Sequence, residues 1–182
     1  REVEEVAKEL RELIKRTEDL IRRALERNRK LVKETRDLIE KVLRDLRDLL
    51  RRLEEEARRR GKDEDVLRTL RRLLEELKKK VDEVLKELRR SHEELKKHSD
   101  KVLKELKESH DRLKEKVDEV RRRGVDDKTL RDLLREHKEL VEEAKRRLEE
   151  SNDEHRREVE DAERRIEEIV RDAKRVVDEI ER

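Results

Sequence analysis

Apolar residues recur along this chain at the spacing of an α-helix, in three long stretches of nearly equal length. In the first stretch, positions eighteen residues apart are apolar, as in the row Val3, Ile21, Ile39 and Ala57. Eighteen residues make five turns of a straight helix at 3.6 residues per turn. The pattern therefore predicts one apolar stripe along each helix. Because the period is 3.6 rather than 3.5 residues, we expect helices that are nearly straight.

Two glycines divide the stretches, within the segments RRRGKD at 58–63 and RRRGVD at 121–126. Basic side chains favour the last turn of a helix, and glycine favours the left-handed position that follows it. Asp63 and Asp126 are then candidate N-caps of the next helix. These Gly-x-Asp turns predict a single domain over residues 1–182 with helices at about 2–60, 63–123 and 126–181.

Turns this short require neighbouring helices to run antiparallel. The predicted fold class is all-α, a long antiparallel three-helix bundle made of a helical hairpin and a third helix. At 1.5 Å per residue, each helix would be roughly 85–90 Å long. On the exposed faces, many charged residues are spaced for i,i+4 pairing, such as Glu12 with Arg16 and Glu40 with Arg44.

Composition excludes several classes of function. Charged residues make up 60% of the chain, but the net charge is only +2, so no long-range field attracts nucleic acid or an anionic membrane. We interpret the arginine runs before the glycines as partners of helix C-termini rather than as nucleic-acid patches. No apolar run approaches the roughly 18 residues of a membrane span. The chain has no cysteine, which excludes disulfides and thiolate chemistry.

Almost all the short uncharged polar residues, and all five histidines, fall on the apolar stripes rather than on the charged faces. Thr69 and Thr129 are exceptions, since they lie in the first turns of helices. We predict that the others form a polar network in the core: Thr17, Asn28, Thr35, Ser91, His92, His98, Ser99, Ser109, His110, His137, Ser151, Asn152 and His155.

Folding the sequence at Lys62 and Val125 brings these polar residues to matching heights on the three helices. Thr17, Ser109, His110 and His137 fall within about one turn of one another. A second group follows from the same folding. In it, His98 is level with Asn152, Ser99 is level with Ser151, and Asn28 is within one position of His155. Ser91 and His92 lie about one turn from Asn28, and Thr35 lies a further turn away.

A buried polar group without a partner costs about 1–3 kcal/mol, so these side chains are expected to bond to one another. The alternative is that some of them lie at partly exposed edges of their stripes. His98, at the rim of its stripe, is the residue for which this alternative is strongest, whereas Asn28, His137 and His155 lie near mid-stripe.

The same residues do not suggest catalysis. Ser91 and His92 are adjacent on a helix, as are Ser109 and His110, and adjacent side chains do not face each other as a nucleophile and its base must. Both glycines belong to turns, so no glycine-rich phosphate loop exists. Three imidazoles could gather around zinc by accident, but no acidic residue lies on the stripes to complete the site. We predict no enzyme activity, no cofactor and no metal site.

Taken together, the Glu/Lys/Arg/Leu alphabet, the eighteen-residue period, the Gly-x-Asp turns and the polar core positions give the chain a resemblance. It resembles de novo designed helical bundles with buried hydrogen-bond networks, along all 182 residues. This resemblance implies a structural protein whose polar layers specify helix pairing. It also implies an alternative, a pH-responsive bundle or assembly in which protonation of buried histidines disrupts the layers. We expect no nucleic acid, membrane or small-molecule partner, and a monomer, with a homo-oligomer as the alternative. A binding module for an undeclared partner is the third class.

Overall fold

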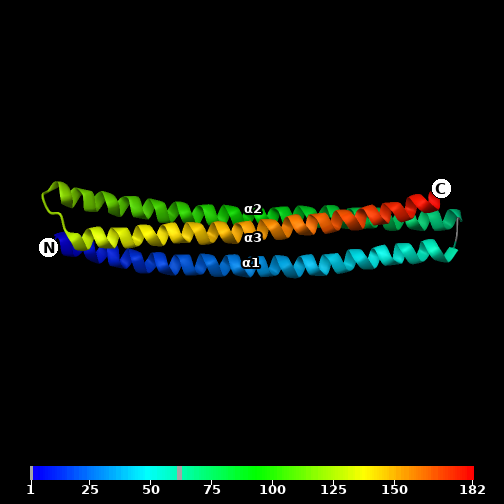
Figure 1. Cartoon of the computed structure of the whole chain (residues 1–182), viewed down its shortest axis with the longest axis horizontal. Coiled ribbons are helices and arrows are strands. Elements are labelled where there is room, and N and C mark those ends of the chain that lie inside the picture. The colour runs from blue at the N-terminus through cyan, green and yellow to red at the C-terminus, as the bar shows by residue number, and fades with distance from the viewer. Residues whose placement is uncertain (1, 61–62) are drawn as a thin grey trace. The chain divides into compact units, whose positions relative to one another are not determined.

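The chain folds into three helices in the computed structural model, which describes residues 2–60 and 63–182 (Figure 1). The helices are α1 at Glu2–Arg60, α2 at Glu64–Arg122 and α3 at Lys128–Glu181. The described residues contain no strand. The predicted all-α, three-helix fold is therefore confirmed.

The ends of the helices show how the sequence stops and restarts them. Gly124 has a φ of 93°, the left-handed conformation expected after a helix, and its N–H donates to the carbonyl of Arg121 at 3.0 Å. The third helix begins two residues later than the sequence predicted. Its N-cap is Asp127 rather than Asp126, because the Asp127 carboxylate accepts the N–H groups of Thr129 at 2.7 Å and Leu130 at 3.3 Å. The other predicted turn glycine, Gly61, lies outside the described residues.

Contacts divide the chain into two compact units, and every helix contributes a segment to each. Unit 1 consists of Arg1–Leu31 and Glu94–Asp153, and unit 2 consists of Val32–Glu93 and Glu154–Arg182. Each unit thus has three helical segments around a core of its own.

In unit 1 the α1 and α2 segments are antiparallel, since Glu9 near the start of α1 pairs with Lys116 near the end of α2 at 2.8 Å. The core consists of two separate apolar clusters. Each fully buried leucine in them contributes about 1.5–3 kcal/mol. One cluster contains Val6, Ala7, Leu10, Leu113, Val117, Val120 and Leu130, and the other contains Ile21, Ala24, Val102, Leu106, Ala144 and Leu148.

In unit 2 the α2 and α3 segments are antiparallel, because Arg89 pairs with Glu163 at 3.4 Å and Arg71 pairs with Glu181 at 2.9 Å. A small apolar cluster holds Leu88, Val159 and Ala162. A much larger one contains Val42, Leu43, Leu46, Leu49, Leu53, Val66, Leu70, Leu73, Leu74, Leu77, Val81, Ile166, Ile169, Ala173 and Val177. Unit 2 therefore has the longer uninterrupted apolar core.

Candidate functional site in the polar core layers

Three groups of polar side chains interrupt the apolar cores, and we call them layers A, B and C. Layer A, in unit 1, consists of Thr17, His110 and His137. Thr17 and His137 are buried, with 2% and 0% of their surface exposed, and His110 is half-buried. Thr17 Oγ1 lies 2.9 Å from His137 Nε2, and His137 Nδ1 lies 2.9 Å from His110 Nδ1. One side chain from each helix thus forms a continuous hydrogen-bonded chain.

The two imidazole rings of layer A lie edge to edge. Their planes differ by 4° and their centroids are 5.1 Å apart. Parallel rings stacked face to face are held about 3.5 Å or more apart by van der Waals contact. The two Nδ1 atoms are closer than that, so the rings share nearly one plane and the contact is an N–H···N hydrogen bond. This geometry requires one nitrogen to carry a proton and the other to offer a lone pair.

Layer C, in unit 2, consists of Thr35, Ser91, His92 and His155 and repeats this arrangement. Thr35 Oγ1 lies 3.0 Å from His155 Nε2, and His155 Nδ1 lies 3.1 Å from His92 Nδ1. The centroids of the two imidazole rings are 5.3 Å apart, and the ring planes differ by 8°. Ser91 Oγ lies a further 3.4 Å from Thr35 Oγ1. As in layer A, the threonine and the histidine from α3 are buried while the histidine from α2 is half-buried.

Layers A and C are copies related by the eighteen-residue repeat. Thr17 and Thr35 are eighteen positions apart on α1, as are His137 and His155 on α3. In both layers the threonine and its histidine are 120 residues apart. The sequence period therefore places the same triad twice, once in each unit.

Layer B, in unit 1, consists of Asn28, Ser99 and Asn152. The Asn28 Nδ2 donates to Ser99 Oγ at 3.4 Å, and Ser99 Oγ donates to Asn152 Oδ1 at 3.2 Å. Asn28 and Ser99 are fully buried. The second amide atom of Asn28, Oδ1, is buried and has no hydrogen-bond partner in the described part of the chain. Layer B is thus a chain of two hydrogen bonds with one acceptor left over.

Burial decides the acid–base properties of the α3 histidines. Removal from water, and then the charge of His110, lower the pKa of His137 from 6.5 to about 4. Removal from water, and then His92, lower the pKa of His155 from 6.5 to about 4. Both side chains are therefore neutral at pH 7.

The half-buried His110 is surrounded by charges of both signs. Burial is the main cause that lowers its pKa, and Lys114 and Lys138 act in the same direction. Asp111 and Glu142 oppose this shift. His110 is therefore the member of its pair whose positive charge finds nearby carboxylates.

The remaining predicted network residues lie outside the three layers. Ser109 accepts a hydrogen bond from Arg112 at 3.3 Å, on its own helix, and Ser151 makes no side-chain hydrogen bond that the described residues reveal. His98 is half-buried, and its Nδ1 accepts from the Arg27 guanidinium at 3.4 Å. Burial, then Arg27 and Lys101, lower the pKa of His98. His98 thus lies at the edge of the core, outside the three layers.

The heights predicted for layer B were off by nearly one turn. Folding the sequence placed Asn28 near the level of His155 and Ser99 level with Ser151. In the structure Asn28 bonds to Ser99 and Ser99 bonds to Asn152, whereas His155 bonds to Thr35 and His92. The prediction counted residues from assumed turn positions, and the first of these, Lys62, lies outside the described residues.

Sequence reasoning also missed an ion-pair clamp beside layer C. The guanidinium of Arg36 bonds to Glu154 and Glu158, which flank His155 on α3. These carboxylates raise the pKa of Arg36, with Glu158 the larger cause. The signal was available: Arg36 follows the core residue Thr35, and charged residues next to a stripe face its edges. Since Arg36 is half-exposed, water screens this clamp.

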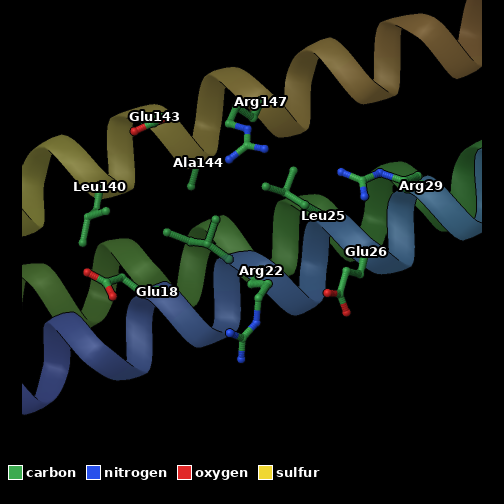
Figure 2. A pocket seen from close by; sticks show the side chains of 10 residues that line it. Glu18, Arg22, Leu25, Glu26, Arg29, Leu140, Glu143, Ala144 and Arg147 are labelled. Atoms are coloured by element: carbon green, nitrogen blue, oxygen red, sulfur yellow. The ribbon is translucent and has the colours of Figure 1, made fainter.

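A shallow groove of about 310 Å³ lies between α1 and α3 in unit 1 (Figure 2). Leu25, Leu140 and Ala144 line it, and Figure 2 shows the side chains of Arg29 and Arg147 extending beside Leu25. Arg22 is the third arginine of the lining, and three glutamates balance the three arginines, so the groove has no net charge: Glu18, Glu26 and Glu143. Nothing in its lining selects a ligand.

The described residues contain no cluster of three or more potential metal ligands. In the same part of the chain, none of the helices combines the length and apolarity that crossing a membrane requires.

Comparison with known proteins places the fold. The sequence matches no protein-family model, and no curated protein matches it. A solved structure described as a "Computationally designed three helix bundle" is similar to this chain, with a TM-score of 0.68 and 18% sequence identity. The similarity covers 98% of this chain and 90% of that chain. At this identity the likeness establishes the three-helix bundle fold.

Proposed function

We propose that the chain is a designed structural bundle whose polar layers specify how its helices pair. The observation that supports this most is the composition of the layers. Layers A, B and C each take side chains from all three helices and bond them to one another. A polar group that is buried is strongly disfavoured unless its own partner is opposite to it.

The physical argument concerns register. Sliding one helix by a turn would leave leucines packed against leucines over most of a stripe, at little cost in apolar burial. The same slide would move Asn28 away from Ser99 and leave buried amide groups unpaired, at about 1–3 kcal/mol each. Leucines therefore supply the stability, and the layers supply the preference for one register.

Layer B has a separate part in this proposal. Layers A and C repeat every eighteen residues, so a slide of eighteen could match a threonine of one layer with a histidine of the other. Layer B does not repeat: the position eighteen residues after Asn28 is Leu46, and the one after Asn152 is Val170. That slide would still match one of the two threonine–histidine pairs, so layer B adds to its penalty.

Further support comes from the small number of large apolar side chains that are exposed on the surface. Among the large apolar side chains of the described residues, only Val125 is exposed, at 43%. We propose a monomer without catalytic activity, cofactor, nucleic-acid or small-molecule partner, because each helix has one apolar stripe and that stripe is covered within its unit.

The test removes layer B. A variant with Asn28→Leu, Ser99→Ala and Asn152→Leu carries nitroxide labels on Glu26→Cys and Glu143→Cys, which line the same groove. The chain has no other cysteine, so labelling is unique. Pulsed electron paramagnetic resonance should show one narrow distance distribution when layer B is intact, and a broad or multiple one when it is removed.

The control is Leu106→Met in the intact layer background, a volume-conserving change in the apolar cluster of unit 1. It should leave the distribution narrow. Light scattering at two protein concentrations reports any change of mass. A variant without layer B that keeps one narrow distribution and a monomer mass refutes the pairing role.

A second candidate function has an observation of its own in its favour. His137 and His155 are fully buried, and burial lowers the pKa of each to about 4, so both are neutral at pH 7. We propose that a pH response is built into the same layers. The acid titration developed in the Discussion tests it.

A further inference from the structure

The histidine pairs of layers A and C share a feature that helix pairing does not require. In each pair, two Nδ1 atoms face each other at hydrogen-bond distance within nearly one plane. The inner imidazole is also held from its other side by a threonine hydroxyl. Every ring nitrogen of the inner histidine therefore has a partner.

At neutral pH, two arrangements of protons satisfy layer A. In one, Thr17 donates to His137 Nε2 and His137 Nδ1–H donates to His110 Nδ1. In the other, His110 Nδ1–H donates to His137 Nδ1 and His137 Nε2–H donates to Thr17 Oγ1. Each neutral imidazole carries one proton in both cases, and the Nδ1–Nδ1 contact holds one proton between two nitrogens.

We propose that each histidine pair is a binding site for one additional proton, which the layer accepts without losing its Nδ1–Nδ1 hydrogen bond. The added proton converts the outer imidazole into an imidazolium, with N–H on both nitrogens. Its Nδ1–H donates to the lone pair of the inner Nδ1. The inner imidazole then keeps its own proton on Nε2 and donates to the threonine.

A second proton has no such place. It would have to bind the inner Nδ1, where it would meet the N–H of the outer ring at about 3 Å, a repulsive contact between two donors and two cations. The inner histidine would also carry its charge in the apolar core. Acid should therefore act on each pair in two steps, and only the second breaks the layer.

The surroundings of layer A place the first charge on the outer ring. Asp111 on α2 and Glu142 on α3 act on His110 in favour of its positive charge, and Lys114 and Lys138 act against it. From α1, Thr17 contacts the inner ring, and Arg16 lies in the groove that Ser109 lines. The inner His137 has no carboxylate among the charges that act on it.

Layer C has a comparable set of charges. Arg36 from α1 is clamped to Glu154 and Glu158, on either side of the inner His155. From α2, Arg89 is paired with Glu163 on α3. Burial, and then the charge of His92, act on the inner His155 and disfavour its positive charge.

The added proton also determines the direction, from donor to acceptor, of the hydrogen bonds in layer A. In the neutral layer both proton arrangements are possible, but the imidazolium of His110 can only donate. The hydrogen bonds must then run from His110 to His137 and from His137 to Thr17. The first proton thus selects the Nε2–H tautomer of His137 before the layer opens.

The test is nuclear magnetic resonance of the intact ¹⁵N-labelled chain, titrated from pH 7.5 to 3.5. An N–H···N hydrogen bond transmits a scalar coupling between its two nitrogens, so the coupling between His110 Nδ1 and His137 Nδ1 reports the bond directly. We expect this coupling at pH 7.5 and its persistence after His110 has taken a proton. It should vanish only when His137 is protonated.

The variant His110→Gln removes the pair in layer A and leaves layer C as an internal measure of folding. It should abolish the layer A coupling and leave the coupling between His92 and His155 unchanged. If the coupling disappears when His110 takes the first proton, the inference is overturned, and the pairing role of the layers stands. No coupling at pH 7.5 overturns the inference at its first step and leaves layer B, on which the pairing test rests, untouched.

Discussion

Acidification from pH 7.5 to 4.5 should destabilise this protein through its two inner histidines, His137 and His155. Their pKa values of about 4 in the folded state compare with 6.5 for the free side chain. A depressed pKa means that folding favours the neutral form. The stabilisation is therefore complete above pH 6.5 and is lost as the pH falls from 6.5 towards 4.

The size of the effect follows from proton linkage. At pH 4.5 each inner histidine is almost fully protonated in the unfolded chain but mostly neutral in the folded one. The free energy of unfolding then falls by about 2.5 kcal/mol for each histidine, since one pKa unit corresponds to about 1.4 kcal/mol. The two together give about 5 kcal/mol. Below pH 4 the loss should level off, because both states then bind the proton.

The assay is guanidinium unfolding followed by helicity at both pH values. The slope of the unfolding free energy for a chain of this size is about 5 kcal/mol per molar guanidinium, so the expected shift of the midpoint is about 1 M. A variant with His137→Gln and His155→Gln supplies the reference. Protonation of surface carboxylates affects both proteins equally, so the difference between their shifts belongs to the histidines.

His98→Gln is the matched control, because His98 is half-buried and lies outside the layers. It should reproduce most of the shift of the parent protein. Equal midpoint shifts in the parent and in the double variant would falsify the linkage argument. The purely structural role of the layers would then remain.

Three other substitutions test single features of the structure. Asn28→Leu should leave the free energy of unfolding unchanged or raise it by about 1–2 kcal/mol, because Asn28 Oδ1 is buried without a partner; a loss above about 3 kcal/mol in chemical unfolding contradicts this. Gly124→Ala should lower the free energy of unfolding by about 1 kcal/mol. Its φ of 93° is the only cause, since an added Cβ would meet no atom within 4 Å. An unchanged melting temperature would show that backbone strain is not the reason for this glycine. Asp127→Ala should lower the free energy of unfolding by about 1 kcal/mol, because α3 loses its N-cap, whereas Asp126→Ala should leave it nearly unchanged. If thermal unfolding shows Asp126→Ala to be the more destabilising change, the cap assignment is wrong.

The helices were the part of the structure that the sequence determined best. An apolar stripe of period 3.6 leaves a helix with a single face to bury, and the glycine at 124 can only be a turn once its neighbours are helical. The N-cap was harder to predict, because Asp126 and Asp127 are adjacent aspartates with the same chemistry. Which of them caps α3 depends on the path of the turn, and local sequence does not fix that path.

The members of the layers were predictable to within about one helical turn. Folding the sequence at its turns grouped Thr17, Ser109, His110 and His137. All but Ser109 join layer A, since an error of a few ångströms leaves long side chains within reach. The same error assigned Asn28 to the wrong partners, because asparagine and serine side chains are too short to bridge it. Periodicity assigns a residue to a stripe, but only packing decides the partner of a short side chain.

Hydrogen-bond detail was beyond the sequence for a different reason. The stripes of α2 and α3 predicted that His110 and His137 would meet, but rotamers decide which nitrogen faces which. Nδ1 pairs with Nδ1 here because the buried Thr17 holds His137 by Nε2. The identity of the third residue therefore determines the chemistry of the pair.

Layers A and C carry the same triad but are backed by different amounts of apolar packing. In unit 1 the apolar clusters have seven and six buried members, whereas the larger cluster of unit 2 has fifteen. Protonation of His137 and of His155 removes about the same free energy, because their pKa values are depressed equally. An equal loss of free energy is a larger fraction of the stabilisation that the smaller apolar clusters of unit 1 supply. The response to acid should therefore begin around layer A. The eighteen-residue repeat thus duplicates the chemistry of the site, while the leucines around each copy decide what that chemistry does to the fold.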